Sequence, residues 1–337
     1  MKKKIFSFVI LCFSISILST PQYSTIKPTN ELKITEDIPY KSNFFYIPEK
    51  KYFVFGRRTS GFSVYDSNGK LIKKYNPPSQ SPGFLMDLEQ FFITEKFYYA
   101  VGLFNIVKLD KNFNFVEDIT KGNAGGGSVC WINNKENFYC ATSTYGLEYL
   151  NRKGIVIKQN TDIIIKKRQK TISRYFSRLK FYVDYPSIYF ICDGGLQFYK
   201  LNLKTLKTIY KRQLPIPKDF KSAFKEDKKV NLGFSMERFL KEAKGYGRVW
   251  TIYISGDYLF VAWKKTALPD GFVDIYSISK NKILYHLKLE DTEETIFHRM
   301  TFNPKKPVLY DYDYIEVEDG NDYGLIRAYD LTKFLKN

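Results

Sequence analysis

A recurring β-hairpin pattern constrains the fold of this chain more than any other feature. In the first clear copy, residues 61–75, apolar and polar side chains alternate, pass through a turn at Ser67-Asn68-Gly69, and alternate again. Alternation on both sides of a short polar turn predicts two antiparallel strands. Asn, Ser and Gly suit the turn because they tolerate positive φ or bond their own backbone.

The centre of this hairpin, a glycine followed by alternating apolar and aromatic residues, occurs six times. The copies begin at or near Gly61, Gly102, Gly146, Gly195, Gly271 and Gly324. A second apolar hairpin precedes each copy, as in residues 45–47 and 52–55. Two hairpins per repeat predict four antiparallel strands, and six repeats predict an all-β, six-bladed β-propeller. A two-sheet sandwich is the rival fold, but it would not explain so regular a repeat.

The two ends of the chain predict how the ring closes. The last repeat has strand patterns at 299–303, 308–317 and 324–330 but little room for a fourth. A lone strand pattern at 31–36 is expected to supply it, which would hide edges that otherwise pair promiscuously. We therefore assign residues 31–337 to a single propeller domain and the polar residues 20–30 to a flexible leader.

The longest connection, the insertion over residues 213–248, is predicted to hold the one helix, near 235–245. Ser235 would cap a helix over residues 236–244, which Gly245 would end. Its apolar residues fall on one side at helical spacing. They are Met236, Phe239, Leu240 and Ala243. Such a stripe is typical of a helix packed on the body, and a lid over one face is the alternative.

The start of the chain predicts export. Three consecutive lysines, an apolar run over residues 5–18 and small polar residues after it are typical of a secretory signal, here residues 1–19. The run is short for a membrane span, and no other stretch approaches that length. A lipoprotein anchor at Cys12 is not expected, because Leu11 occupies a position that favours a small residue. We expect a periplasmic or extracellular protein with no transmembrane segment in the mature chain.

The charge balance favours anionic partners. The chain has 53 Lys and Arg against 35 Asp and Glu, a formal net charge of +18. A basic surface attracts polysaccharide, phospholipid headgroups or nucleic acid, and we expect no nucleic acid partner for an exported protein. The alternative is that a lysine-rich genome produces such a balance without any anionic partner.

Cations in the longer loops predict a binding face. Loops between strands two and three of each repeat, and between repeats, emerge on one face of a propeller, and binding residues are often carried by such loops. We expect their cations to form a basic rim, although ordinary solvated surface charge is the alternative. The rim residues are Arg57, Arg58, Lys121, Lys166, Lys167, Arg168, Arg174, Lys264, Lys265 and Arg299.

Two cysteines flank a predicted hairpin turn. Cys130 and Cys140 lie on either side of residues 133–137, so a cross-strand disulfide is one hypothesis for an oxidising compartment. It would have to meet strict geometry. The alternative is that these residues and Cys192 are small buried hydrophobes.

The blade hairpin also carries a resemblance to known proteins. Residues 62–71, Phe-Ser-Val-Tyr-Asp-Ser-Asn-Gly-Lys-Leu, resemble the blade hairpin of bacterial six-bladed propellers of the NHL and TolB-like type. The resemblance covers most of residues 31–337. It implies the fold and a secreted setting, but little about chemistry.

These features favour a secreted, monomeric binding or scaffold protein that recognises an anionic glycan or a protein partner through its basic face. A structural envelope component and a channel-centred hydrolase or lactonase are the alternatives. The hydrolase would need a carboxylate or metal site, and the chain has only two histidines, His286 and His298. Both are predicted to be structural or exposed, so we assign no catalytic residue, metal ligand or cofactor.

Overall fold

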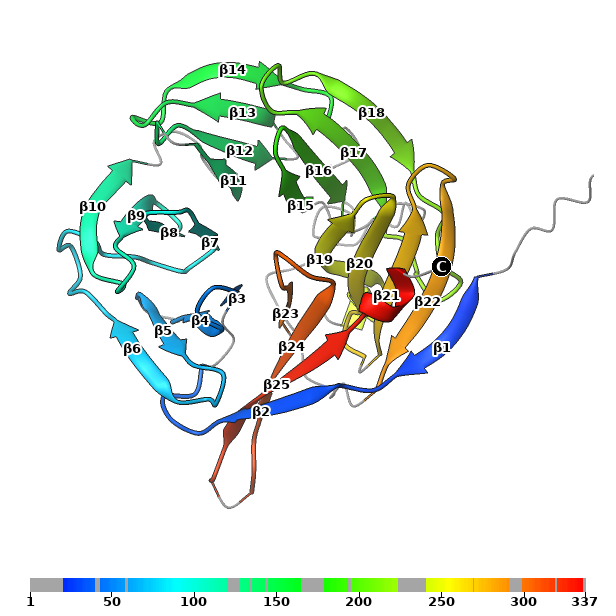
Figure 1. The fold of residues 1–337 in the computed structure, drawn as a ribbon, viewed down its shortest axis with the longest axis horizontal. Coiled ribbons are helices and arrows are strands. Elements are labelled where there is room, and N and C mark those ends of the chain that lie inside the picture. Colours follow the sequence, from blue (N-terminus) through cyan, green and yellow to red (C-terminus); the bar gives the residue numbers. More distant parts are fainter. Residues whose placement is uncertain are drawn as a thin grey trace, which may run out of the picture.

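Six sheets form a ring in the computed structural model of the chain (Figure 1). Five have four antiparallel strands, and the sixth adds one parallel strand to its four antiparallel strands. The predicted six-bladed β-propeller is therefore confirmed. The structure describes most of the chain, and the statements below concern the described residues. These are 21–39, 43–57, 60–120, 128–133, 135–142, 145–164, 179–192, 195–223, 241–268, 270–290, 299–318 and 320–335.

The first three blades each run outward from the centre in chain order. Blade 1 contains β3 (Phe44–Ile47), β4 (Tyr52–Gly56), β5 (Phe62–Tyr65) and β6 (Leu71–Tyr75). Blade 2 contains β7 (Gln90–Ile93), β8 (Tyr98–Val101), β9 (Asn105–Leu109) and β10 (Phe115–Thr120). Blade 3 contains β11 (Ser128–Ile132), β12 (Phe138–Thr142), β13 (Gly146–Leu150) and β14 (Val156–Asn160).

The remaining blades follow the same plan, with two additions from the N-terminal region. Blade 4 contains β15 (Leu179–Asp184), β16 (Ser187–Cys192), β17 (Gln197–Asn202) and β18 (Thr208–Gln213). Blade 5 contains β19 (Gly247–Ser255), β20 (Tyr258–Lys265), β21 (Gly271–Ser277), β22 (Lys282–Leu289) and a fifth strand, β1 (Gln22–Ile26). Blade 6 contains β23 (Arg299–Phe302), β24 (Val308–Ile315), β25 (Tyr323–Asp330) and β2 (Asn30–Ile34), and the 3₁₀ helix η2 (Thr332–Leu335) follows β25.

Strand β2 closes the ring as predicted. It pairs antiparallel with β25, with Leu32 opposite Ile326, and Figure 1 shows it along the outer side of the last blade. Ile34 is fully buried in a cluster that contains Phe44 of blade 1 and Tyr312 of blade 6. Blade 6 is thus completed by the N-terminal part of the chain, while its inner strand contacts β3 of the first blade.

The predicted flexible leader instead contains strand β1. It pairs in parallel with β22, from Gln22 opposite Tyr285 to Ile26 opposite Leu289. Only Ile26 of this strand is buried. The prediction was wrong because the segment is polar and binds mainly through its backbone, which leaves little apolar pattern in the sequence.

The hydrophobic core consists of layers between adjacent blades. One cluster joins Val54 and Phe62 of blade 1 to Phe91 and Tyr98 of blade 2. At the closing seam, the Phe55 ring of blade 1 meets the Tyr312 ring of blade 6, with centroids 4.7 Å apart at 61°. Flat aromatic rings fill the space between twisted sheets, and edge-to-face pairs add to the free energy of burial.

Backbone geometry explains the glycine that opens the repeated motif in blades 1 and 3. Gly61 has φ of 71° and Gly146 has φ of 90°, values that side chains other than glycine adopt with strain. A Cβ atom on Gly61 would lie 1.8 Å from the Tyr75 carbonyl oxygen, and one on Gly146 would lie 2.0 Å from that of Asn160. The glycine therefore lets the third strand start against the end of the fourth.

The disulfide hypothesis is not supported. Cys130 and Cys140 are both buried, and no disulfide joins them. The ladder pairs Val129 with Cys140 and shifts register before Trp131, so Cys130 lies in a β-bulge and not opposite Cys140. The Cys130 thiol instead donates a hydrogen bond to the Tyr139 carbonyl oxygen at 3.4 Å, and burial raises its pKa.

Two predictions fall wholly or partly outside the described residues. The signal over residues 1–19 lies there, as does most of the predicted helix. Residues 241–243 are helical, and Gly245 follows with φ of 81°, as expected for a glycine that ends a helix. Ala243 is fully buried. None of the helices in the described part of the chain is both long and apolar enough to cross a membrane.

The glycine requirement can be tested in blade 1. Gly61→Ala should lower the free energy of unfolding by roughly 3 kcal/mol, because the Cβ would clash with backbone that cannot move cheaply. Gly256→Ala is the matched control, since Gly256 also has positive φ, 57°, but has no atom within 4 Å of its Cβ position. Urea unfolding should show a loss of only about 1 kcal/mol for the control. Equal losses would mean that the clash at Gly61 is relieved.

Candidate functional site

The structure describes four of the ten cations assigned to the basic rim. These are Arg57, Lys264, Lys265 and Arg299. The other six lie outside the described residues, and they are Arg58, Lys121, Lys166, Lys167, Arg168 and Arg174.

Arg57 contacts an acid at the ring closure. Its guanidinium donates to Asp37 Oδ2 at 2.7 Å, and Lys74 Nζ lies 3.0 Å from the other oxygen of that carboxylate. Burial acts to raise the pKa of Asp37, but hydrogen bonds from Lys74 and Ser63 and the charge of Arg57 outweigh it and lower that pKa. Arg57 therefore holds the segment that follows β2 against blade 1.

Lys264 and Lys265 belong to strand β20, which continues through both residues, and not to a loop. Lys264 pairs with Arg248 on one side and Gly271 on the other, and only 4% of its surface is exposed. Lys265 Nζ lies 3.4 Å from Asp270 Oδ2. The prediction that both lysines lie on an exposed rim was wrong, and the cause is strand pairing.

Lys264 belongs to a buried group of charges between blades 5 and 6, which we call the seam network. Its other members are Asp311 and Asp313 of β24 and Arg327 of β25, all at most 3% exposed. Arg327 donates to Asp313 through its guanidinium, and its Nε lies 3.5 Å from Glu31 of β2. Burial lowers the pKa of Lys264 to about 8, although Asp311 and Asp313 act to raise it.

Sequence reasoning missed the seam network, although a signal was present. Aspartates alternate with tyrosines along residues 310–314, which places Asp311 and Asp313 on one face of the strand. The pattern indicates a charged face. The β24–β25 hairpin places Arg327 opposite Asp311, but only the packing of blade 5 against blade 6 shows that Lys264 meets this face.

Arg299 belongs to a second group, which we call the axial cluster. Three cations surround the indole ring of Trp250: the guanidinium carbons of Arg248 and Arg299 lie 4.7 Å and 5.0 Å from its centroid, and Lys180 Nζ lies 5.8 Å away. Each contact is within the range of a cation–π interaction. The four residues come from β15, β19 and β23, the adjoining inner strands of blades 4, 5 and 6 (Figure 1).

Strand direction brings the three cations to one end of the ring. Lys180 and Arg248 are second in their strands and Arg299 is first in its strand. Each inner strand begins where a between-blade connection arrives, so the axial cluster lies on the loop-rich face that the sequence predicted. The ladder between β19 and β20 skips Trp250 between Val249 and Thr251. Such a bulge re-aims a side chain.

The axial cluster has the chemistry of an anion site. Arginine guanidinium groups match carboxylate, phosphate and sulfate oxygens in a forked geometry. All four side chains are partly exposed, so a ligand at this end of the ring can reach them. The Trp250 ring adds an apolar surface beside the charges.

His286 is held in a buried structural position. Its Nδ1 lies 2.6 Å from Asp274 Oδ1 and its Nε2 lies 3.1 Å from Asp219 Oδ2. Trp263 donates to the other oxygen of Asp274. With both ring nitrogens engaged by carboxylates, His286 is not placed to accept a proton from a nucleophile. The arrangement ties β20, β21 and β22 to the insertion.

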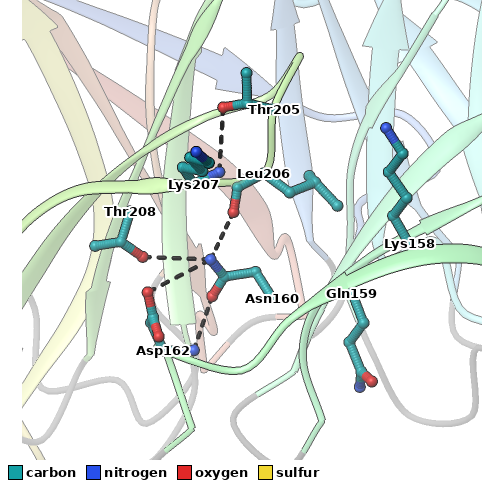
Figure 2. A pocket seen from close by; sticks show the side chains of 8 residues that line it. All are labelled: Lys158, Gln159, Asn160, Asp162, Thr205, Leu206, Lys207 and Thr208. Atoms are coloured by element: carbon teal, nitrogen blue, oxygen red, sulfur yellow. Dashed lines mark hydrogen bonds between the residues drawn. The ribbon is translucent and has the colours of Figure 1, made fainter.

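An open groove of about 570 Å³ lies between the outer parts of blades 3 and 4 (Figure 2). The Asn160 side chain, from β14, donates to the Leu206 carbonyl oxygen at 2.5 Å, and its own carbonyl accepts from the Asp162 backbone at 2.7 Å. Because these polar groups satisfy one another, the groove floor is a structural contact and not a small-molecule site.

Comparison with known proteins supports the fold. No family model and no curated protein matches the chain. A candidate exported protein from Bacteroides fragilis matches with a TM-score of 0.57 and 12% identity over 92% of this chain and 99% of that chain. A member of the DUF4221 family from Bacteroides vulgatus matches with a TM-score of 0.52 and 11% identity, over 90% and 97%. At these identities the likeness shows the fold alone, and the chain is a six-bladed β-propeller protein.

The seam network predicts a pH dependence of stability. The pKa of Lys264 is about 8 in the folded protein against an ordinary value of 10.5. Between these values the unfolded chain binds more protons, so the contribution of Lys264 to stability rises with pH. The free energy of unfolding of the wild type, less that of Lys264→Met, should increase by roughly 1–2 kcal/mol between about pH 8 and pH 10 in urea titrations. If the difference in the free energy of unfolding between the two proteins did not change with pH, the lowered pKa assigned to Lys264 would be contradicted.

Proposed function

We propose that this protein is an exported binding protein that holds an anionic group of its ligand at the axial cluster. The observation that carries the proposal is the convergence of Lys180, Arg248 and Arg299 on Trp250 at the loop-rich end of the ring. Export is supported by the basic and apolar start of the chain and by the similarity to a candidate exported protein.

The proposed binding site is a smaller part of the basic face that the sequence predicted. Arg57 and Lys265 contact acids, and Lys264 is buried, whereas Arg299 lies with two further cations that the loop analysis did not include. An anionic glycan, or an acidic group on a protein partner, supplies the oxygens that these side chains bind. The described residues add no observation in favour of the hydrolase alternative, and binding is the function that the geometry supports best.

Retention on immobilised heparin, a sulfated glycan, tests the proposal. Arg248→Gln with Arg299→Gln should weaken binding at least tenfold, because two charge-assisted contacts are removed while side-chain bulk is largely retained. The matched control is Lys70→Gln with Lys96→Gln, which removes the same charge from exposed turns on the opposite face. Trp250→Phe should retain most of the affinity.

The control variant shows whether heparin binds at the axial cluster or is retained by the overall positive charge of the protein. Elution of the two double variants at the same reduced salt concentration would contradict a localised site and leave only the overall basic charge. Thermal unfolding of each variant establishes that the ring is intact before the comparison is made.

A further inference from the structure

The outer edge of blade 3 is more exposed than the outer edges of blades 1 and 4. Along β14 the first four residues are all exposed, whereas β6 and β18 alternate between exposed and half-buried positions. Three consecutive apolar residues are uncovered at its start: Ile155, Val156 and Ile157 are 60%, 44% and 49% exposed. An outer strand with exposed apolar side chains is a ready site for pairing with another strand.

The same molecule shows how such an edge is covered. In blade 5, β1 adds in parallel to the outer strand β22, and Tyr285 and Leu287 of β22 are 8% and 0% exposed. The pairing begins immediately after a bulge, since the β21–β22 ladder skips Leu284 and β1 pairs from Tyr285 onward. An outer strand of this propeller therefore accepts a fifth strand in a defined register.

The corresponding position in blade 3 has the same bulge. The β13–β14 ladder skips Ile157 and resumes at Lys158, so residues 158–162 correspond to the part of β22 that β1 covers. Among the described strands, β14 has β13 as its single neighbour. The open groove runs along these residues, with residues 158–160 on one wall and 205–208 on the other (Figure 2). It leaves room for an extended segment.

Charge defines what the groove would accept. Lys158 and Lys207 line it and are exposed, and Lys211 Nζ approaches the Asp162 backbone oxygen at 3.4 Å. Asp162 is the one acid among the lining residues. In Figure 2 the Lys158 and Gln159 side chains point to opposite sides of β14. The edge thus combines three cations with exposed apolar residues, which complements a segment of alternating acidic and apolar residues.

We propose that β14 is the docking edge for an extended acidic segment of a partner protein, which adds to blade 3 as a fifth strand. Backbone pairing begins at Lys158, in the register that β1 uses on β22, and the adjoining part of the segment covers Ile155 to Ile157. Main-chain hydrogen bonds supply affinity, while acidic and apolar side chains supply selectivity. This surface is separate from the axial cluster, so it does not depend on the proposed function.

Fluorescence anisotropy with labelled synthetic peptides tests the proposal. A peptide of alternating Glu and Val should bind the full chain, and its Lys-and-Val counterpart should bind at least tenfold more weakly. Ile157→Glu with Lys158→Glu should raise the dissociation constant of the acidic peptide at least tenfold. The matched control is Ile72→Glu with Lys73→Glu, which changes the same dipeptide at the same bulge in blade 1 and should leave the constant within about twofold.

Hydrogen exchange locates the contact directly. Addition of the acidic peptide should slow amide exchange at residues 158–160 and leave the edge of blade 1 unchanged. The proposal would be overturned if both double variants weakened binding of the acidic peptide equally, or if the two peptides bound equally well. It would also be overturned if neither peptide bound, or if the acidic peptide slowed amide exchange elsewhere. Self-association of the chain that Ile157→Glu abolishes would also overturn it, because the occupant would then be a second copy.

Discussion

The pairing of β2 with β25 is the contact on which the ring depends. The Thr29 backbone amide and hydroxyl both donate to the Ala328 carbonyl oxygen, across 299 residues of sequence. A connection of this length costs closure entropy that only many cooperative contacts can offset. Such contacts lie in the residues just after β2. Tyr65 donates a hydrogen bond to the Asp37 carbonyl oxygen at 2.6 Å, and Tyr312 donates one to the Pro39 carbonyl oxygen at 2.5 Å. The segment from Thr29 to Pro39 therefore holds the first and last blades together.

The seam network lies beside this closure. Arg327 lies in the strand that pairs with β2 and contacts Glu31 on β2 itself, as well as Asp313 within blade 6. Removing either partner of such a buried pair leaves an uncompensated charge, so the seam network specifies how blades 5 and 6 meet. The axial cluster lies where the inner strands of blades 4, 5 and 6 adjoin. Closure of the ring thus positions the proposed binding residues, which lie on inner strands, whereas β2 is an outer strand.

Much of the fold could be predicted from the sequence, because each blade is a local unit. Alternation and turn residues locate the hairpins, and the missing fourth strand of the last repeat points to residues 31–36. The candidate site could be predicted only in part. Lysines after an apolar strand look like loop residues, so the burial of Lys264 was missed. The axial cluster joins Lys180, Arg248 and Arg299 from three repeats, and no local pattern reports which inner strands adjoin. Strand β1 was missed because a polar segment held by its backbone leaves no apolar period.

Native-state hydrogen exchange measures the central claim most directly, since it compares the closing pair with an interior ladder in the intact protein. If β2 locks the ring, the amides of Leu32 and Ile326 should exchange with the same free energy of opening as those of the β12–β13 ladder in blade 3, because loss of β2 opens the whole propeller. If β2 instead detaches by itself, opening several kcal/mol below the rest while the other blades stay protected, then closure is a peripheral contact and the account is wrong.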